Sequence, residues 1–151
     1  MKLLACAMSA ALGCVAPATA AVPVKVADAW CRAASPGAMT GACYLTLTSA
    51  ADDRLVGVET KAAERAEVHD MSMAGGVMRM RKVEGGLALP AGKAVTLKPG
   101  GLHVMVIRPK QAFALGGTVP LTLKFARSAP VTLQAPVHAA DPMAGMAGMH
   151  H

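Results

Sequence analysis

The chain has 151 residues, a length that supports one domain with a hydrophobic core. Aromatic residues make up only 3% of it, so the core must come from Val, Leu, Ala and the unusually frequent Met, of which there are 11. The formal net charge is +6, but the basic residues are scattered and have no aromatic residues between them. This pattern gives no support for nucleic-acid binding. It fits a solvated basic surface or attraction to an acidic protein partner.

The first twenty residues predict a secretory signal peptide. A lysine supplies a positive start, residues 3–15 are apolar and uncharged, and residues 18–20 (Ala-Thr-Ala) form a small-residue cleavage site. We therefore expect export to the periplasm. Lipid attachment at Cys14 is an alternative, because a small residue precedes this cysteine. No transmembrane segment is expected in the mature chain, since no later stretch is apolar over a sufficient length.

Two cysteines, Cys31 and Cys43, remain after removal of the signal peptide. An even pair in an oxidising compartment predicts a structural disulfide. The intervening residues 35–41 contain Pro and Gly and would allow the chain to turn back. The spacing is not the Cys-x-x-Cys of thioredoxin-like sites. Metal ligation, redox sensing and thiol oxidoreductase activity stay open as alternative roles of the two cysteines.

Short strands separated by turns are predicted throughout residues 21–137, which we interpret as one all-β domain. Apolar and polar residues alternate in residues 44–48, 119–126 and 131–137. A period of two is typical of strands with one buried face, and Gly and Pro punctuate the intervals. The pattern predicts a β-sandwich or barrel. Only residues 61–68 are expected to form a helical turn.

A methionine-rich hairpin is predicted at residues 69–80, HDMSMAGGVMRM. If the two glycines form a two-residue turn, the pairing of the arms follows. The predicted cross-strand pairs are Ala74 with Val77, Met73 with Met78, Met71 with Met80, and His69 with Lys82. Alternation then places His69 and the four methionines on one face, with His69 and Met80 as diagonal neighbours. A slip by one residue would move one arm to the other face.

A second pair of candidate ligands, His103 and Met105, lies two residues apart in an extended run and therefore shares one face. Together with His69 and Met80 they predict a site of two imidazoles and two thioethers. These soft, neutral donors suit Cu(I), whereas zinc sites prefer Cys, His and carboxylate, and blue-copper sites need a Cys beside two His. The alternative is a methionine face that simply fills the core. We expect such a core position for Met39.

The composition changes at the C-terminal end, where residues 138–151 read HAADPMAGMAGMHH. This segment is too poor in large apolar residues to order itself, and we predict a flexible tail. Short His-rich tracts are candidates for metal binding, and imidazole nitrogens suit Cu(II). The candidate ligands of this second site are Met143, Met146, Met149, His150, His151 and additionally His138.

Four segments together resemble the PCu(A)C family of periplasmic copper chaperones. They are DAWCRA (28–33), GACYLTLT (41–48), HDM…GGVMRM (69–80) and LKPGGLHVM (97–105). In the family motif, ten residues separate a His from a Met, and about twenty-one or twenty-two residues separate that Met from His-x-Met. The two gaps in this chain are ten and twenty-two residues. The likeness covers residues 22–137.

The resemblance implies a cupredoxin-like Greek-key β-barrel that binds Cu(I) through His69, Met80, His103 and Met105. It implies a carrier and not an enzyme, with copper delivered to an apo respiratory oxidase, notably the copper A centre of cytochrome c oxidase, or to another copper-trafficking protein. Some members of the family carry a similar Met- and His-rich tail. Copper buffering or tolerance without delivery uses the same site and remains an alternative, as does a β-sandwich interaction domain without metal.

Two features depart from the family pattern. The cysteines at positions 31 and 43 stand where small or apolar residues are expected, which leaves a thiol role open. Met71, Met73 and Met78 add sulfur atoms near the predicted site, so the choice of thioether ligand is less determined than the choice of imidazole.

Overall fold

The computed structural model describes residues 23–139, which form ten β-strands and no helix. The strands are β1 (Val24–Arg32), β2 (Thr40–Ser49), β3 (Asp53–Glu59), β4 (Ala63–Ala74), β5 (Val77–Lys82), β6 (Leu87–Leu89), β7 (Ala94–Leu97), β8 (His103–Pro109), β9 (Thr118–Phe125) and β10 (Val131–His138). Within that range no helix suited to crossing a membrane is found. The predicted signal peptide, Cys14 and the tail ligands Met143, Met146, Met149, His150 and His151 lie outside the described residues.

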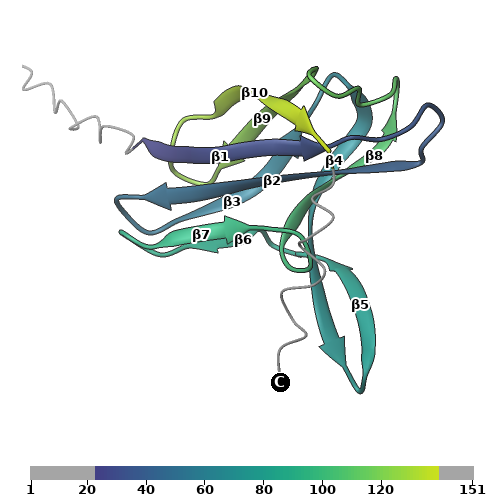
Figure 1. Ribbon diagram of the computed structural model, residues 1–151. Coiled ribbons are helices and arrows are strands. Elements are labelled where there is room, and N and C mark those ends of the chain that lie inside the picture. Colours follow the sequence, from purple (N-terminus) through teal and green to yellow (C-terminus); the bar gives the residue numbers. More distant parts are fainter. Residues whose placement is uncertain (1–22, 140–151) are drawn as a thin grey trace, which may run out of the picture.

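Seven of the strands close into a barrel, in the order β4-β8-β2-β1-β10-β9-β3, and β3 pairs with β4 to complete the ring (Figure 1). Strands β1 and β10 run parallel, and the other barrel neighbours run antiparallel. Strands β6 and β7 pair with β3 and β2, and β5 pairs with β4 alone. This arrangement confirms the predicted all-β barrel.

The interior of the barrel is aliphatic, as the composition requires. Leu45 and Leu47 in β2 and Leu121 and Leu123 in β9 are fully buried, or nearly so. The residue between the two leucines of each strand is less buried, as the predicted alternation requires. Because successive side chains of a strand point to opposite faces, each barrel strand offers one row to the core and one row to the outer surface. The outer rows are where a surface site can form.

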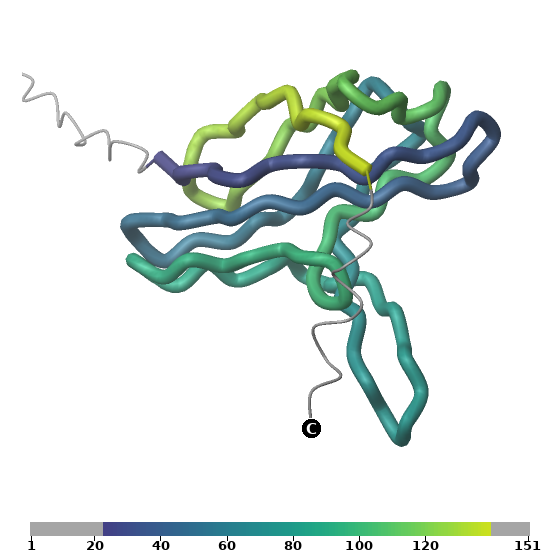
Figure 2. The backbone as a smooth tube through the Cα atoms, viewed as in Figure 1, coloured from purple at the N-terminus to yellow at the C-terminus, as the bar shows by residue number. Residues whose placement is uncertain are grey.

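Strands β4 and β5 form a hairpin that projects away from the barrel, as both backbone views show (Figures 1 and 2). The four predicted cross-strand pairs are all observed, from Ala74 opposite Val77 to His69 opposite Lys82. Gly75 and Gly76 have φ angles of 60° and 77°, the left-handed values that a two-residue turn of this kind requires. The double glycine therefore fixes the register of the hairpin.

Two local expectations were wrong, and a third needs adjustment. Residues 61–68 form no helical turn, because β4 begins at Ala63 and pairs with both β3 and β8. Met39 is 65% exposed and lies outside the core. His138, which we assigned to the tail, is the last residue of β10, and its carbonyl accepts a hydrogen bond from the N–H of Ala33.

The predicted disulfide joins Cys31 of β1 to Cys43 of β2. The two residues are cross-strand partners, and both are fully buried in the core. Neither sulfur is therefore available to a metal or to a redox partner. The bond ties together two strands whose outward-facing residues line the cleft described below.

We expect the double substitution Cys31→Ala and Cys43→Ala to lower the free energy of unfolding by about 3 kcal/mol, because the bond closes a loop in the unfolded chain. Urea unfolding would measure the change. The wild type unfolded in reductant is the control, since it loses the bond but keeps the side-chain volume. An unchanged midpoint in both samples would contradict a stabilising role.

Candidate metal centre

The two imidazoles of the predicted site lie on the outer face of the barrel wall formed by β4 and β8. These strands pair antiparallel, with His69 opposite His103 and Glu67 opposite Met105. Val104, between the two β8 residues, is fully buried in the core. The alternation thus sends Val104 into the barrel and its two neighbours outward, as the sequence predicts.

An open cleft runs along this face, where the hairpin meets β8. Its lining includes Met71 and Met80 from the hairpin and His103 and Met105 from β8. The remaining lining comes from β1, β2 and the adjoining loops, and consists of Arg32, Ala33, Ala34, Thr40, Gly41, Ala42, Tyr44 and Gly100. The cleft therefore collects three thioethers, one each from β4, β5 and β8, around one imidazole.

The orientation of His103 is fixed by the loop that precedes β8. Its side chain is only 4% exposed, and its Nδ1 lies 2.9 Å from the carbonyl oxygen of Gly101. A carbonyl only accepts hydrogen bonds, so Nδ1 carries the proton and the lone pair lies on Nε2. Metal-binding histidines commonly donate their second nitrogen in this way. The tautomer of His103 is thus the one that a metal ligand needs.

His69 has a matching arrangement, with the roles of the two nitrogens exchanged. Its Nε2 donates to Oε2 of Glu67 at 3.0 Å, while its Nδ1 is buried and has no hydrogen-bond partner among the described residues. The rings of His69 and His103 are 6.1 Å apart, centroid to centroid. An unpaired buried acceptor is costly, and coordination of a metal ion would satisfy it.

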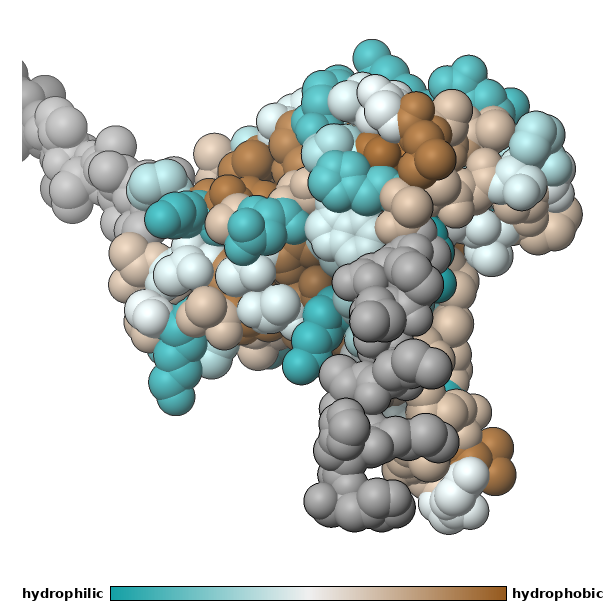
Figure 3. Space-filling model, in the orientation of Figure 1, coloured by the Kyte–Doolittle hydropathy of each residue, from teal (hydrophilic) through white to brown (hydrophobic). Residues whose placement is uncertain are grey.

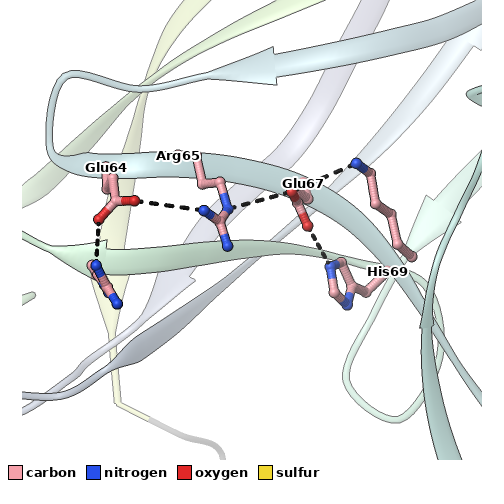
Figure 4. A network of polar contacts seen from close by, with 6 residues as sticks. Glu64, Arg65, Glu67 and His69 are labelled. Atoms are coloured by element: carbon pink, nitrogen blue, oxygen red, sulfur yellow. Dashed lines mark hydrogen bonds and ion pairs between the residues drawn. The ribbon is translucent and has the colours of Figure 1, made fainter.

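Glu67 is a residue of the candidate site that the sequence analysis missed. The hydrogen bond from His69 holds the pKa of this carboxyl below its usual range, against the opposing effect of burial, and Lys82 and Arg65 contribute in the same direction. The Nζ of Lys82 is 3.6 Å and the Nε of Arg65 is 3.4 Å from Oε1 (Figure 4). Glu67 is therefore an ionised acceptor. Its place two residues before His69 on a strand was the available signal.

The structure does not gather all the predicted ligands equally. Met80, His103 and Met105 line the cleft, and Met71 joins them, whereas His69 lies beside His103 and is not among the lining residues. Met73 and Met78 form the next pair along the hairpin toward its turn, beyond the pair of Met71 and Met80. These four residues are the methionine face of the hairpin. The methionine face is not core, because Met80 is 46% exposed and the two outer methionines more so.

The donor chemistry of the cleft selects a soft ion of low charge. Within residues 23–139 no three His, Cys, Asp or Glu side chains lie close enough to share a metal ion, so a zinc-type site is not found there. Thioether and imidazole donors suit Cu(I). Arg32, which also lines the cleft, repels a divalent ion more than a monovalent one. The residues of the cleft therefore fit Cu(I).

Comparison with solved structures gives matches among copper proteins. The copper-bound PCuAC domain from PmoF2 is 28% identical, with a TM-score of 0.66 over 80% of this chain and 97% of that domain. The solution structure of apo-DR1885 from Deinococcus radiodurans is 30% identical, with a TM-score of 0.60 over 93% of this chain and 95% of that one. The CuI-DR1885 structure is also 30% identical, with a TM-score of 0.57 over 80% and 82% of the two chains.

Comparison with protein families and curated proteins gives a consistent result. The family model described as "Putative lipoprotein LpqE-like" matches residues 24–137. A curated relative, "Putative lipoprotein Lxx21020" from Leifsonia xyli subsp. xyli (strain CTCB07), is 27% identical over 137 residues, which are 91% of this chain and 82% of that protein. The chain therefore belongs to the LpqE-like family and has the cupredoxin-like fold of the PCu(A)C domains.

Proposed function

We propose that the protein is an exported copper chaperone that carries Cu(I) on the outer face of its barrel. The proposed ligands are His69, Met80, His103 and Met105, with Met71 as an adjacent thioether. The observation that carries the proposal is the pair of imidazoles at 6.1 Å, each with one nitrogen donating to the protein and the other left for a metal. The copper-bound state of related domains supports the same reading.

The donor set suits a carrier better than a permanent store. No thiolate is offered by the described residues, because Cys31 and Cys43 form a disulfide. Neutral thioethers and imidazoles hold Cu(I) without the charge of a thiolate, so a partner with stronger donors can remove it. The cleft is open on the surface, and Met80 is half-exposed, so a partner can reach the ion.

The recipient that we propose is an apo respiratory oxidase subunit with a copper A centre, or another copper-trafficking protein. Arg79 and Arg81 are exposed on β5 and form no ion pair within residues 23–139, so they offer positive charge to an acidic partner.

We further propose that the chain works in the periplasm. The lipoprotein description of the family supports the alternative in which Cys14 is lipidated and anchors the chain.

The first test is Cu(I) binding by a chain that ends at Ala139, so that β10 is complete and the tail is absent. We expect one tightly held Cu(I) in competition with a colorimetric chelator. The double variant His103→Ala, Met105→Ala should hold none, because it loses an imidazole and a thioether of the cleft. Met39→Ala, an exposed methionine outside the hairpin, is the control and should bind normally. No binding by the parent would refute the proposal.

A second test concerns the residue that orients His69. We expect Glu67→Ala to weaken Cu(I) binding by about 10- to 100-fold, the usual effect of removing the hydrogen-bond partner of a ligating histidine. Glu64→Ala is the matched control, since Glu64 lies on the same strand but pairs with Arg65 and Arg108. The same chelator competition measures both variants. Equal affinities in the two variants would show that Glu67 has no part in the site.

The tail is proposed as a separate Cu(II) site formed by Met143, Met146, Met149, His150 and His151. We expect the full-length mature protein to bind more Cu(II) than the chain that ends at Ala139, because the tail supplies imidazole nitrogens. Equilibrium dialysis followed by metal analysis would give the two stoichiometries. If the Cu(II) capacity of the two chains is the same, the tail is not a copper site.

A further inference from the structure

The methionine face of the hairpin continues beyond the cleft. Met71 and Met80, which line the cleft, are cross-strand partners, and the next pair on the same face toward the turn is Met73 with Met78. Cβ atoms of directly opposite residues lie about 4.5–5.5 Å apart. Successive pairs on one face are separated by about 7 Å, which is two residues along a strand. Two long, flexible thioether chains therefore stand together one step outside the cleft.

The exposure of this outer pair is unusual for methionine. Met73 is 67% and Met78 is 51% exposed, whereas methionine usually fills gaps in a core. The space-filling view shows apolar colours at the end of the projecting hairpin (Figure 3). Because the double-glycine turn fixes the register, the two side chains are held on the same face and cannot drift to opposite sides. Packing in a hydrophobic core therefore does not explain why methionines stand at these two positions.

The positively charged side chains of the hairpin are placed so that they do not repel a cation from the outer methionine pair. Arg79 and Arg81 alternate with the methionines of β5 and therefore point to the opposite face. Lys82 shares the methionine face, but it lies at the base of the hairpin, with its Nζ 3.6 Å from Glu67. No basic residue of β4 or β5 accompanies Met73 and Met78 at the outer end of this face.

We propose that Met73 and Met78 form an outer Cu(I) site, weaker than the cleft and adjacent to it. The inference rests on the proposed copper function and adds a second site to it. Two neutral thioethers without an imidazole are soft donors that give the ion only two ligands, so they bind Cu(I) loosely. A loose site at the exposed end of the arm, one step from the cleft, is suited to accept the ion from solution or to offer it to a partner.

The test is an anaerobic Cu(I) titration of the full-length mature protein with ¹³C-labelled methionine methyl groups, followed by NMR. We expect the first Cu(I) to shift the signals of Met80 and Met105, and further Cu(I) to shift those of Met73 and Met78 together. The signal of Met39 should stay unchanged, since this exposed methionine lies outside the hairpin. The tail methionines report their own binding separately.

The variant Met73→Leu, Met78→Leu keeps the volume and apolar character of the pair but removes both sulfurs. It should bind the first Cu(I) with unchanged affinity and lose the additional Cu(I) assigned to the outer site. Signals of Met73 and Met78 that stay unmoved while Met80 and Met105 shift would overturn the outer site and leave the proposed function intact. If Met80 and Met105 do not shift either, the proposed function itself fails.

Discussion

The pairing of β4 with β8 is the constraint on which the site depends. In this ladder Val68 lies opposite Val104 and both face the core, while His69 lies opposite His103 and both face outward. Burial of the valines stabilises this register, at about 1.5–3 kcal/mol for each fully buried side chain. A slip of one residue would send the imidazoles into the core. The hydrophobic core therefore sets the distance between the two imidazoles, although it contributes no ligand.

The sequence predicts those parts of the site that are local. Double glycine between alternating residues specifies the hairpin, and His-x-Met on a strand specifies one face, so both halves follow from short-range rules. The strand pairing that brings these two halves together is not local in the sequence. Pairing of β4 with β3 and β8 overrides the helix-favouring Ala-Glu-Arg composition of residues 61–68, and the same pairing places Glu67 opposite Met105. A single sequence holds no signal for such long-range partners.

The disulfide and part of the cleft lining use opposite faces of β1 and β2. Cys31 and Cys43 point into the core, and their neighbours Arg32 and Ala42 line the cleft. The covalent bond thus supports the wall of the cleft and at the same time removes both thiols from the set of donors. The cleft is thus left with imidazole and thioether donors, which are neutral.

Exposed thioethers on a projecting hairpin create a problem of their own. The outer edge of β5 pairs with no other strand of residues 23–139, and an unpaired apolar edge strand invites association with other chains. Charged side chains are the usual protection, and β5 carries Arg79, Arg81 and Lys82 in a strand of six residues. Because Arg79 and Arg81 alternate with Met78 and Met80, the strand exposes its sulfurs on one face and these two charged side chains on the other. The basic residues of the hairpin therefore have a structural reason that is independent of any partner, and the methionines do not.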